Sequence, residues 1–208
     1  MVYIMPVKPN FNPDYLYFVT TAAVKHIRLF RRDVIKQIIV DSLHHLRTTG
    51  KMKLFVFVIM PNHIHIIALF SEEHSLSNVM RDFKKFTARQ IYRQFQVEEN
   101  TKVLDVLRKE GERVKQEYKV WEDGYDARDV FSVEFLQQKM DYIHHNPCQP
   151  QWKLVDTPEE CLWSTAGFYF AGRPCSSCKR WQAFWKTLLG CWCKKCRTPS
   201  FWKTRSSF

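Results

Sequence analysis

The sequence lacks an uninterrupted apolar segment long enough to cross a membrane. Its longest apolar stretch, residues 54–70, is interrupted by Pro61, Asn62, His63 and His65, whereas a membrane-spanning helix needs about 20 consecutive apolar residues. The amino-terminal residues also lack the charged segment, apolar segment and small-residue cleavage site of a secretory signal. These absences exclude a membrane-spanning protein. We expect a cytoplasmic protein without a membrane partner.

Acidic residues are scarce, and none follows Glu160. The chain contains 32 Lys and Arg against 21 Asp and Glu, which gives a net charge of +11. Aromatic side chains are interleaved with the basic residues after Glu160. Because Lys and Arg neutralise phosphates and aromatic faces stack on unpaired bases, the composition favours a nucleic-acid partner. A basic, solvated tail with a small aromatic core is the alternative.

The length of 208 residues suits one domain with an appendage. The sequence contains no internal repeat and no low-complexity segment. Gly172 and Pro174 mark a boundary. We therefore divide the chain into a principal domain over residues 1–172 and a small, cysteine-rich, basic tail over residues 173–208.

Hydrophobic periodicity predicts three strands and three helices in the principal domain. Strands are expected over residues 15–23, 52–59 and 63–70. Helices are expected over residues 33–48, 75–95 and about 132–145. The β-α-β-β-α order begins a ferredoxin-like layout. The fold class is thus α+β: a ferredoxin-like, RRM-like antiparallel sheet with helices on its faces. The charge-rich residues 98–119 are expected to form an exposed insertion that is helical in part.

Two histidines alternate within the third expected strand. Alternate side chains of a strand project to the same face, so His63 and His65 project together while Ile64 points to the opposite face. Imidazole is the commonest metal-binding side chain, and the pair supplies two ligands of a metal site. A strand edge with two solvated histidines is the alternative reading.

The third helix carries a tyrosine and an asparagine one turn apart. Tyr142 and Asn146 are four residues apart and share a face that borders the apolar stripe of the helix. A helix packed beside the histidine strand would present both side chains to the imidazoles. Taken alone, a tyrosine such as Tyr142 beside an apolar stripe is usually a packing residue, and an asparagine such as Asn146 before a proline is usually a cap or turn.

Three segments of the chain resemble the HUH single-strand DNA transposases, and most closely the REP-associated tyrosine transposases. These segments are PNHIHII, then DYIHHNP, then LWSTAGFYF. The basic segment FKKFTARQIYRQF and the segment VWEDGYDARDV fit the same pattern. The resemblance extends over roughly residues 14–172, and the combination of the first two motifs at this distance is its most specific part.

The resemblance implies a role for each matching residue. His63 and His65 match the histidine pair that binds a divalent metal, Asn146 matches the position of a third, amide-oxygen ligand, and Tyr142 matches the nucleophile. It implies a metal-dependent transposase that cleaves and rejoins single-stranded DNA through a 5′-phosphotyrosine intermediate, at hairpin-forming repeats. Mixed nitrogen and oxygen ligands suit Mg²⁺ or Mn²⁺. A non-catalytic nucleic-acid-binding protein that retains the fold is the alternative, and an RNA-binding module is a weaker one.

The basic helix between the two motifs is the expected DNA-facing surface. Its DNA-binding candidates are Arg81, Lys84, Lys85, Arg89 and Arg93. Tyr92 lies on the same helix and competes with Tyr142 as nucleophile, but we interpret it as part of the DNA-facing surface. Among the other histidines, His144 reads as solvated surface and His145 as an edge of the site. The expected partner is single-stranded or hairpin DNA at the nucleoid, bound by a monomer or a homodimer.

The tail contains two Cys-x-x-Cys pairs, with 14 residues between them. This spacing is close to that of a four-thiolate zinc module, which the transposase family does not require. Its candidate ligands for a structural Zn²⁺ are Cys175, Cys178, Cys193 and Cys196. A reduced, thiol-rich extension without metal is the alternative.

Overall fold

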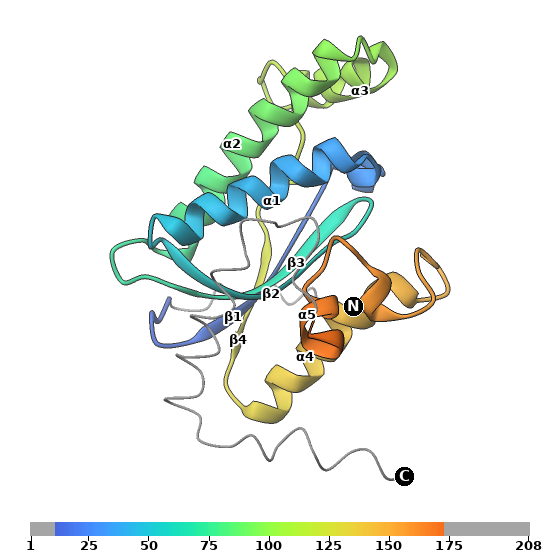
Figure 1. Cartoon of the computed structure of the whole chain (residues 1–208). Helices are drawn as coiled ribbons and strands as arrows, with labels where there is room; N and C mark the ends of the chain where they lie inside the picture. Colours follow the sequence, from blue (N-terminus) through green and yellow to red (C-terminus); the bar gives the residue numbers. More distant parts are fainter. Residues whose placement is uncertain (1–10, 173–208) are drawn as a thin grey trace, which may run out of the picture.

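The computed structural model describes residues 11–172, which form a four-stranded antiparallel sheet with helices on both faces (Figure 1). The strands are β1 (Leu16–Ala22), β2 (Met52–Ile59), β3 (His63–Phe70) and β4 (Asp126–Val130). Their order in the sheet is β2-β3-β1-β4, and every neighbouring pair is antiparallel. This is the order of a ferredoxin-like fold, so the predicted α+β class is confirmed.

Two long helices cover one face of the sheet. They are α1 (Asp33–Thr48) and α2 (Leu76–Val97), and α2 continues beyond the sheet to pack with α3 (Thr101–Glu112) (Figure 1). The buried faces of α1 and α2 form one apolar cluster with residues from all three long strands. The helix predicted over residues 33–48 has these bounds in the structure, and the insertion over 98–119 is helical in part, as expected.

The opposite face is covered by α4 (Val133–His145), with the short α5 (Ala166–Ala171) beside it (Figure 1). Ser132 caps α4, because its side chain accepts a hydrogen bond from the Phe135 amide. The helix ends where Asn146 and Pro147 begin a 3₁₀ turn. A smaller apolar cluster, which includes Phe18, Met140 and Ile143, joins α4 to the sheet.

The histidine strand β3 lies inside the sheet, between β1 and β2. His65 is paired with Thr20 of β1 and Val58 of β2. Ile64 and Ile66 belong to the cluster under α1 and α2, whereas Ile67 belongs to the cluster under α4. Alternation along β3 therefore directs the two histidines toward α4.

The strand β4 was not predicted from the sequence. Its residues, DARDV, are mostly charged and partly exposed, because β4 is an edge strand paired only with β1. Such a segment has no apolar alternation to reveal it. Within residues 11–172, no helix is both long enough and apolar enough to cross a membrane. The predicted tail, with its four candidate zinc ligands, lies outside the described residues.

Candidate active site

Two imidazole rings face α4 at the beginning of β3. The ring centroids of His63 and His65 are 4.7 Å apart, with their planes inclined at 75°. The side chain of Asn62 donates to the His26 carbonyl, so its amide oxygen is turned to His63 Nδ1, at 2.6 Å. An amide oxygen only accepts hydrogen bonds. The proton of His63 therefore lies on Nδ1, and its Nε2 has a free lone pair.

His65 has the same tautomer. Its Nδ1 lies 2.8 Å from Thr20 Oγ1, and its Nε2 lies 3.2 Å from the amide nitrogen of Asn146. Because the amide nitrogen donates, Nε2 of His65 accepts and its Nδ1 carries the proton. Each ring is thus held from behind by an oxygen atom and offers Nε2 forward, the arrangement that metal-ligating histidines adopt.

Both histidines are neutral near pH 7. Burial is the main cause, and it lowers the pKa of His63 to about 4 and that of His65 to about 3. The neighbouring His26 lowers the pKa of His63 further, and His63 and Lys139 do the same for His65. A neutral imidazole is the form that binds a metal ion.

Tyr142 lies against this pair and remains open to solvent. Its ring centroid is 5.2 Å from that of His65 and 6.2 Å from that of Phe18, and its side chain is 45% exposed. The ammonium group of Lys139, one turn earlier on α4, lies 5.8 Å from the Tyr142 ring. The phenol therefore combines a fixed ring position with access for a large substrate.

Asn146 completes the cluster and contains an unsatisfied atom. The residue is 3% exposed, and its side-chain oxygen is buried without a hydrogen-bond partner. A buried polar atom without a partner is costly, and a cation coordinated by this oxygen would satisfy it after rotation of the amide. Two imidazole nitrogens and this oxygen therefore fit a divalent metal. Among residues 11–172 no group of three or more His, Cys, Asp and Glu side chains could hold one, so such a site depends on the amide.

The comparisons with known proteins decide the family. The model of the family described as "Transposase IS200 like" matches residues 15–146, which include the four residues of the site. The chain is an IS200-like transposase. It is therefore a DNA-processing enzyme by family, and the predicted kinship with HUH transposases is confirmed. No curated protein matches this transposase in sequence.

The solved structures that are similar to this transposase include two that the match covers along most of their length. One is a REP-associated tyrosine transposase bound to a REP hairpin, with a TM-score of 0.59, 14% identity, and coverage of 83% of this chain and 90% of that chain. At this identity the match shows a shared fold. The other, a candidate transposase from Deinococcus radiodurans R1, has a TM-score of 0.43 and 16% identity, and the match covers 67% of this chain and 95% of that one.

The predicted DNA-binding residues of the transposase lie on α2, on the other face of the sheet from Tyr142. Four of them are exposed and spaced four residues apart, which places them in one row along the helix: Arg81, Lys85, Arg89 and Arg93. Lys84 differs, because its ammonium group donates to the backbone carbonyls of Glu122 and Gly124 and is half-buried. Burial lowers its pKa to about 8. Lys84 thus fastens the loop that precedes β4.

The structure corrects the predictions made for Tyr92 and His144. Tyr92 is 4% exposed, stacks on Tyr118 and accepts a hydrogen bond from Arg108. It belongs to the α2–α3 packing and is not exposed on the surface of α2. His144 is 1% exposed rather than solvated, and its Nε2 lies 2.9 Å from Thr165 Oγ1. It thereby joins α4 to the segment beside β2.

Sequence reasoning missed the side chain of Trp152, which lies beside His63. The indole of Trp152 lies 5.6 Å from the His63 ring, and the guanidinium of Arg28 lies 5.7 Å from the indole. Neither belongs to a motif, and they are 124 residues apart in the chain (152 − 28).

Proposed function

We propose that this transposase cleaves and rejoins single-stranded DNA through a covalent bond between Tyr142 and the 5′-phosphate of the cut strand. The observation that carries the proposal is the position of the Tyr142 ring against His65, whose Nε2 also contacts Asn146. A nucleophile, two neutral imidazoles and an unsatisfied amide oxygen thus meet on one face of the sheet.

The reaction exchanges one phosphodiester bond for another. The Tyr142 oxygen bonds to phosphorus, the bond from phosphorus to the 3′ oxygen breaks, and the 3′ oxygen receives a proton. The phenol proton passes to solvent. Since the phosphotyrosine retains the energy of the broken bond, the free 3′ hydroxyl can reverse the step without a further energy source. The 5.2 Å ring contact and the packing on Phe18 hold the phenol in place for this attack.

His63, His65 and Asn146 would hold a divalent metal, Mg²⁺ or Mn²⁺. Such an ion supplies charge that polarises the scissile phosphate and fixes its position. Three ligands leave coordination sites for phosphate oxygens and water, which suits an ion that arrives with its substrate. Thr20 and Asn62 keep the two rings in the tautomer that binds metal.

A DNA hairpin is the proposed substrate. The similar REP-associated transposase is bound to a REP hairpin, and the present chain has an exposed basic row on α2 that can neutralise a duplex backbone. We propose that Arg81, Lys85, Arg89 and Arg93 contact phosphates of the hairpin, while the single strand beside it enters the Tyr142 site. The monomer or homodimer expectation stays a prediction.

A covalent-adduct assay tests the proposed reaction. The protein is incubated with a panel of labelled single-stranded hairpin DNAs and Mn²⁺, then denatured and separated by size. We expect a labelled protein adduct that requires the metal and disappears in Tyr142→Phe. Tyr15→Phe is the matched control, because Tyr15 is 46% exposed and immediately precedes β1. It should form the adduct at the wild-type level.

The same assay separates the enzyme from a binding protein. Hairpin binding without any adduct, across the whole panel and with either metal, would contradict the proposed chemistry and favour a non-catalytic DNA-binding protein. An adduct that persists in Tyr142→Phe but disappears after substitution of another tyrosine would assign the nucleophile elsewhere.

A further inference from the structure

A strained loop lies next to the histidine end of the site. Lys25 and His26, in the turn Val24–His26, have φ angles of 51° and 52°. Left-handed backbone is unfavourable at residues other than glycine and persists where the surroundings impose it. Here Asn62 donates to the His26 carbonyl, and the Val24 amide donates to the Val120 carbonyl. The protein maintains this strained turn directly beside the ligand His63.

The turn brings Arg28 to Trp152. The Arg28 side chain is exposed, and its guanidinium carbon lies 5.7 Å from the centre of the indole. Trp152 follows the helix end at Asn146–Cys148, and its amide donates to the Gln149 carbonyl. Its half-buried ring lies 5.6 Å from that of His63. Neither side chain has a role in the attack or in metal binding as proposed above.

The aromatic rings of the site form a continuous series. Tyr142 contacts His65, His65 contacts His63, and His63 contacts Trp152, with centroid distances of 5.2, 4.7 and 5.6 Å. Arg28 follows at the Trp152 end. The nucleophile is therefore at one end of the series, and an indole with a guanidinium is at the other.

The geometry of phosphoryl transfer relates the order of these rings to the direction of the DNA strand. In an in-line displacement at phosphorus, the leaving oxygen lies opposite the attacking oxygen. When the Tyr142 oxygen attacks from one side, the nucleotide that carries the leaving 3′ oxygen extends away from it. With the scissile phosphate held at the histidines, this nucleotide would lie on the side of the ring series where Trp152 and Arg28 are. An aromatic face stacks on an unpaired base and a guanidinium pairs with phosphate.

We propose that Trp152 and Arg28 form a subsite for the nucleotide on the 5′ side of the cut, the one that leaves with a free 3′ hydroxyl. This inference rests on the proposed Tyr142 reaction and assigns the strand polarity within the site. After cleavage, the subsite retains the fragment that is no longer covalently attached. Its 3′ oxygen then attacks the phosphotyrosine, the bond from phosphorus to the Tyr142 oxygen breaks, and the phenol regains a proton. The subsite thus governs rejoining more than cleavage.

The first test measures retention of the released fragment. A 5′-labelled hairpin substrate is cleaved by wild type, Trp152→Ala, Trp152→Phe and Arg28→Ala, and dissociation of the labelled fragment and yield of rejoined strand are followed. Loss of one stacked base corresponds to about a tenfold faster dissociation. We expect that change for Trp152→Ala, a smaller one for Arg28→Ala, and near wild-type retention for Trp152→Phe. Adduct formation should change much less in each variant.

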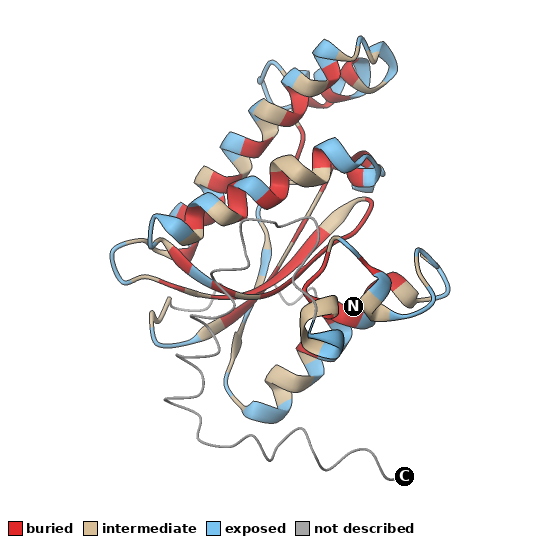
Figure 2. Cartoon of the chain, in the orientation of Figure 1, coloured by how far each residue is buried: buried red, intermediate tan, exposed pale blue. Residues whose placement is uncertain are grey.

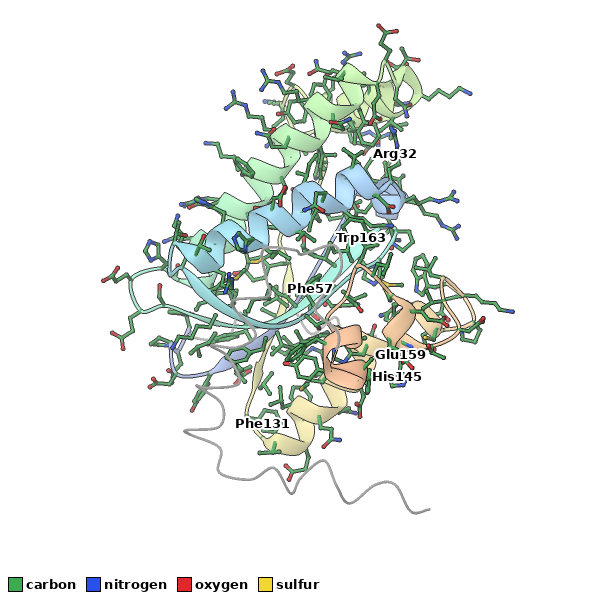
Figure 3. The ribbon with its side chains drawn as sticks, in the orientation of Figure 1. Arg32, Phe57, Phe131, His145, Glu159 and Trp163 are labelled. Atoms are coloured by element: carbon green, nitrogen blue, oxygen red, sulfur yellow. The ribbon has the colours of Figure 1, made fainter. Side chains whose placement is uncertain are left out.

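Matched controls separate the subsite from general damage. Arg31→Ala removes an exposed arginine of the next turn, Leu29–Arg31. Phe131→Ala removes a 75% exposed aromatic residue at the far end of α4 from His145 (Figure 3). Both should retain the fragment as wild type does. Arg28→Ala removes an exposed side chain, so it remains informative even if Trp152→Ala fails to fold.

A fluorescence experiment tests the polarity without cleavage. In Tyr142→Phe, 2-aminopurine is placed at the nucleotide on the 5′ side or on the 3′ side of the mapped cleavage point. Stacking quenches this base, so we expect quenching at the 5′ position that Trp152→Ala relieves. Quenching by Trp152 at the 3′ position only, or unchanged retention in both Trp152→Ala and Arg28→Ala, would overturn the subsite while the Tyr142 adduct still forms. Absence of the wild-type adduct would overturn both proposals.

Discussion

The two faces of the sheet differ in what they contribute to the protein. Under α1 and α2, the inward side chains of β3 are apolar and belong to a large apolar cluster. Under α4, the same strand contributes His63, His65 and Ile67, and the apolar cluster is much smaller. Figure 2 shows the central strands largely buried between these layers. Because side chains alternate along β3, one face of this strand contributes to the apolar core and the other carries the histidines of the candidate site.

The largest effect is expected from a substitution on the α4 face of β3, and a substitution at the next residue tests the opposite face. His65→Ala removes a proposed metal ligand and the ring that Tyr142 contacts, and metal ligands contribute strongly to such reactions. We expect adduct formation to fall by at least about 100-fold, with DNA affinity nearly unchanged because phosphate contacts dominate it. Gel analysis of the adduct, together with a binding titration, measures both. Full cleavage in His65→Ala would place the metal elsewhere.

The neighbouring substitution Ile66→Ala should have the opposite pattern. Ile66 is 1% exposed and packs in the cluster under α1 and α2. Its truncation should lower the free energy of unfolding by about 2–5 kcal/mol, measured by urea denaturation. Under conditions where the variant remains folded, its adduct yield with saturating DNA should equal that of wild type. A selective loss of adduct in folded Ile66→Ala would show that the two faces are coupled.

The buried His144 makes the α4 face sensitive to acid. Burial lowers its pKa to about 3, from an ordinary value of 6.5. Above pH 6.5 the ring is neutral in both the folded and the unfolded chain, so protonation of His144 does not change the free energy of unfolding. As the pH falls from 6.5 toward 3, only the unfolded chain binds the proton, and stability decreases by about 1.4 kcal/mol per pH unit.

The variant His144→Asn removes this dependence. Relative to its own value at pH 7.5, wild type should lose about 2 kcal/mol more than His144→Asn at pH 5. Urea denaturation of both proteins at the two pH values measures the difference. His63 and His65 are present in both proteins, so their own terms cancel. Equal pH dependence of the two proteins would contradict a neutral, buried His144.

The smallest effects are expected from the basic row on α2, which lies on the stable face. Arg93→Ala removes one exposed charge. It should weaken hairpin binding several-fold and reduce the slope of log affinity against log salt by about one. Cleavage at saturating DNA should not change. Lys53→Ala, an exposed lysine on β2, is the control. If the slope of log affinity against log salt is unchanged in Arg93→Ala, Arg93 does not contact DNA phosphates and the proposed role of α2 is contradicted.

The sequence predicted the helices and strands that have a clear apolar pattern. It predicted few of the features that depend on tertiary contacts. The bounds of α1, β2 and β3 were predicted to the residue. The apolar positions of α1 follow a helical period, and the turn at Pro61 and Asn62 divides the apolar run of β2 and β3. The four residues of the site were found from motifs, and their local spacing on one strand and one helix end brings them together. The strand β4 has no such pattern, and its pairing with β1 decides its conformation.

Side chains whose environment comes from a distant segment could not be predicted. His144 lies one residue beyond the apolar position Ile143, and it is covered by contacts with Thr165 and with the rings of Tyr169 and Phe170, which come from a distant segment. Lys84 was indistinguishable from its exposed neighbours until the 122–124 loop supplied two carbonyl groups. Trp152 and Arg28 meet only in the folded protein.

The short turn that ends α4 ties two functions to one rigid body. Tyr142 and Asn146 are separated by a single helical turn, and Pro147 stops the helix immediately afterwards. A displacement of α4 from the sheet would carry the attacking phenol and the amide away as a pair. If the proposed roles hold, a movement of α4 away from the sheet would therefore withdraw the nucleophile and one of the three metal ligands together.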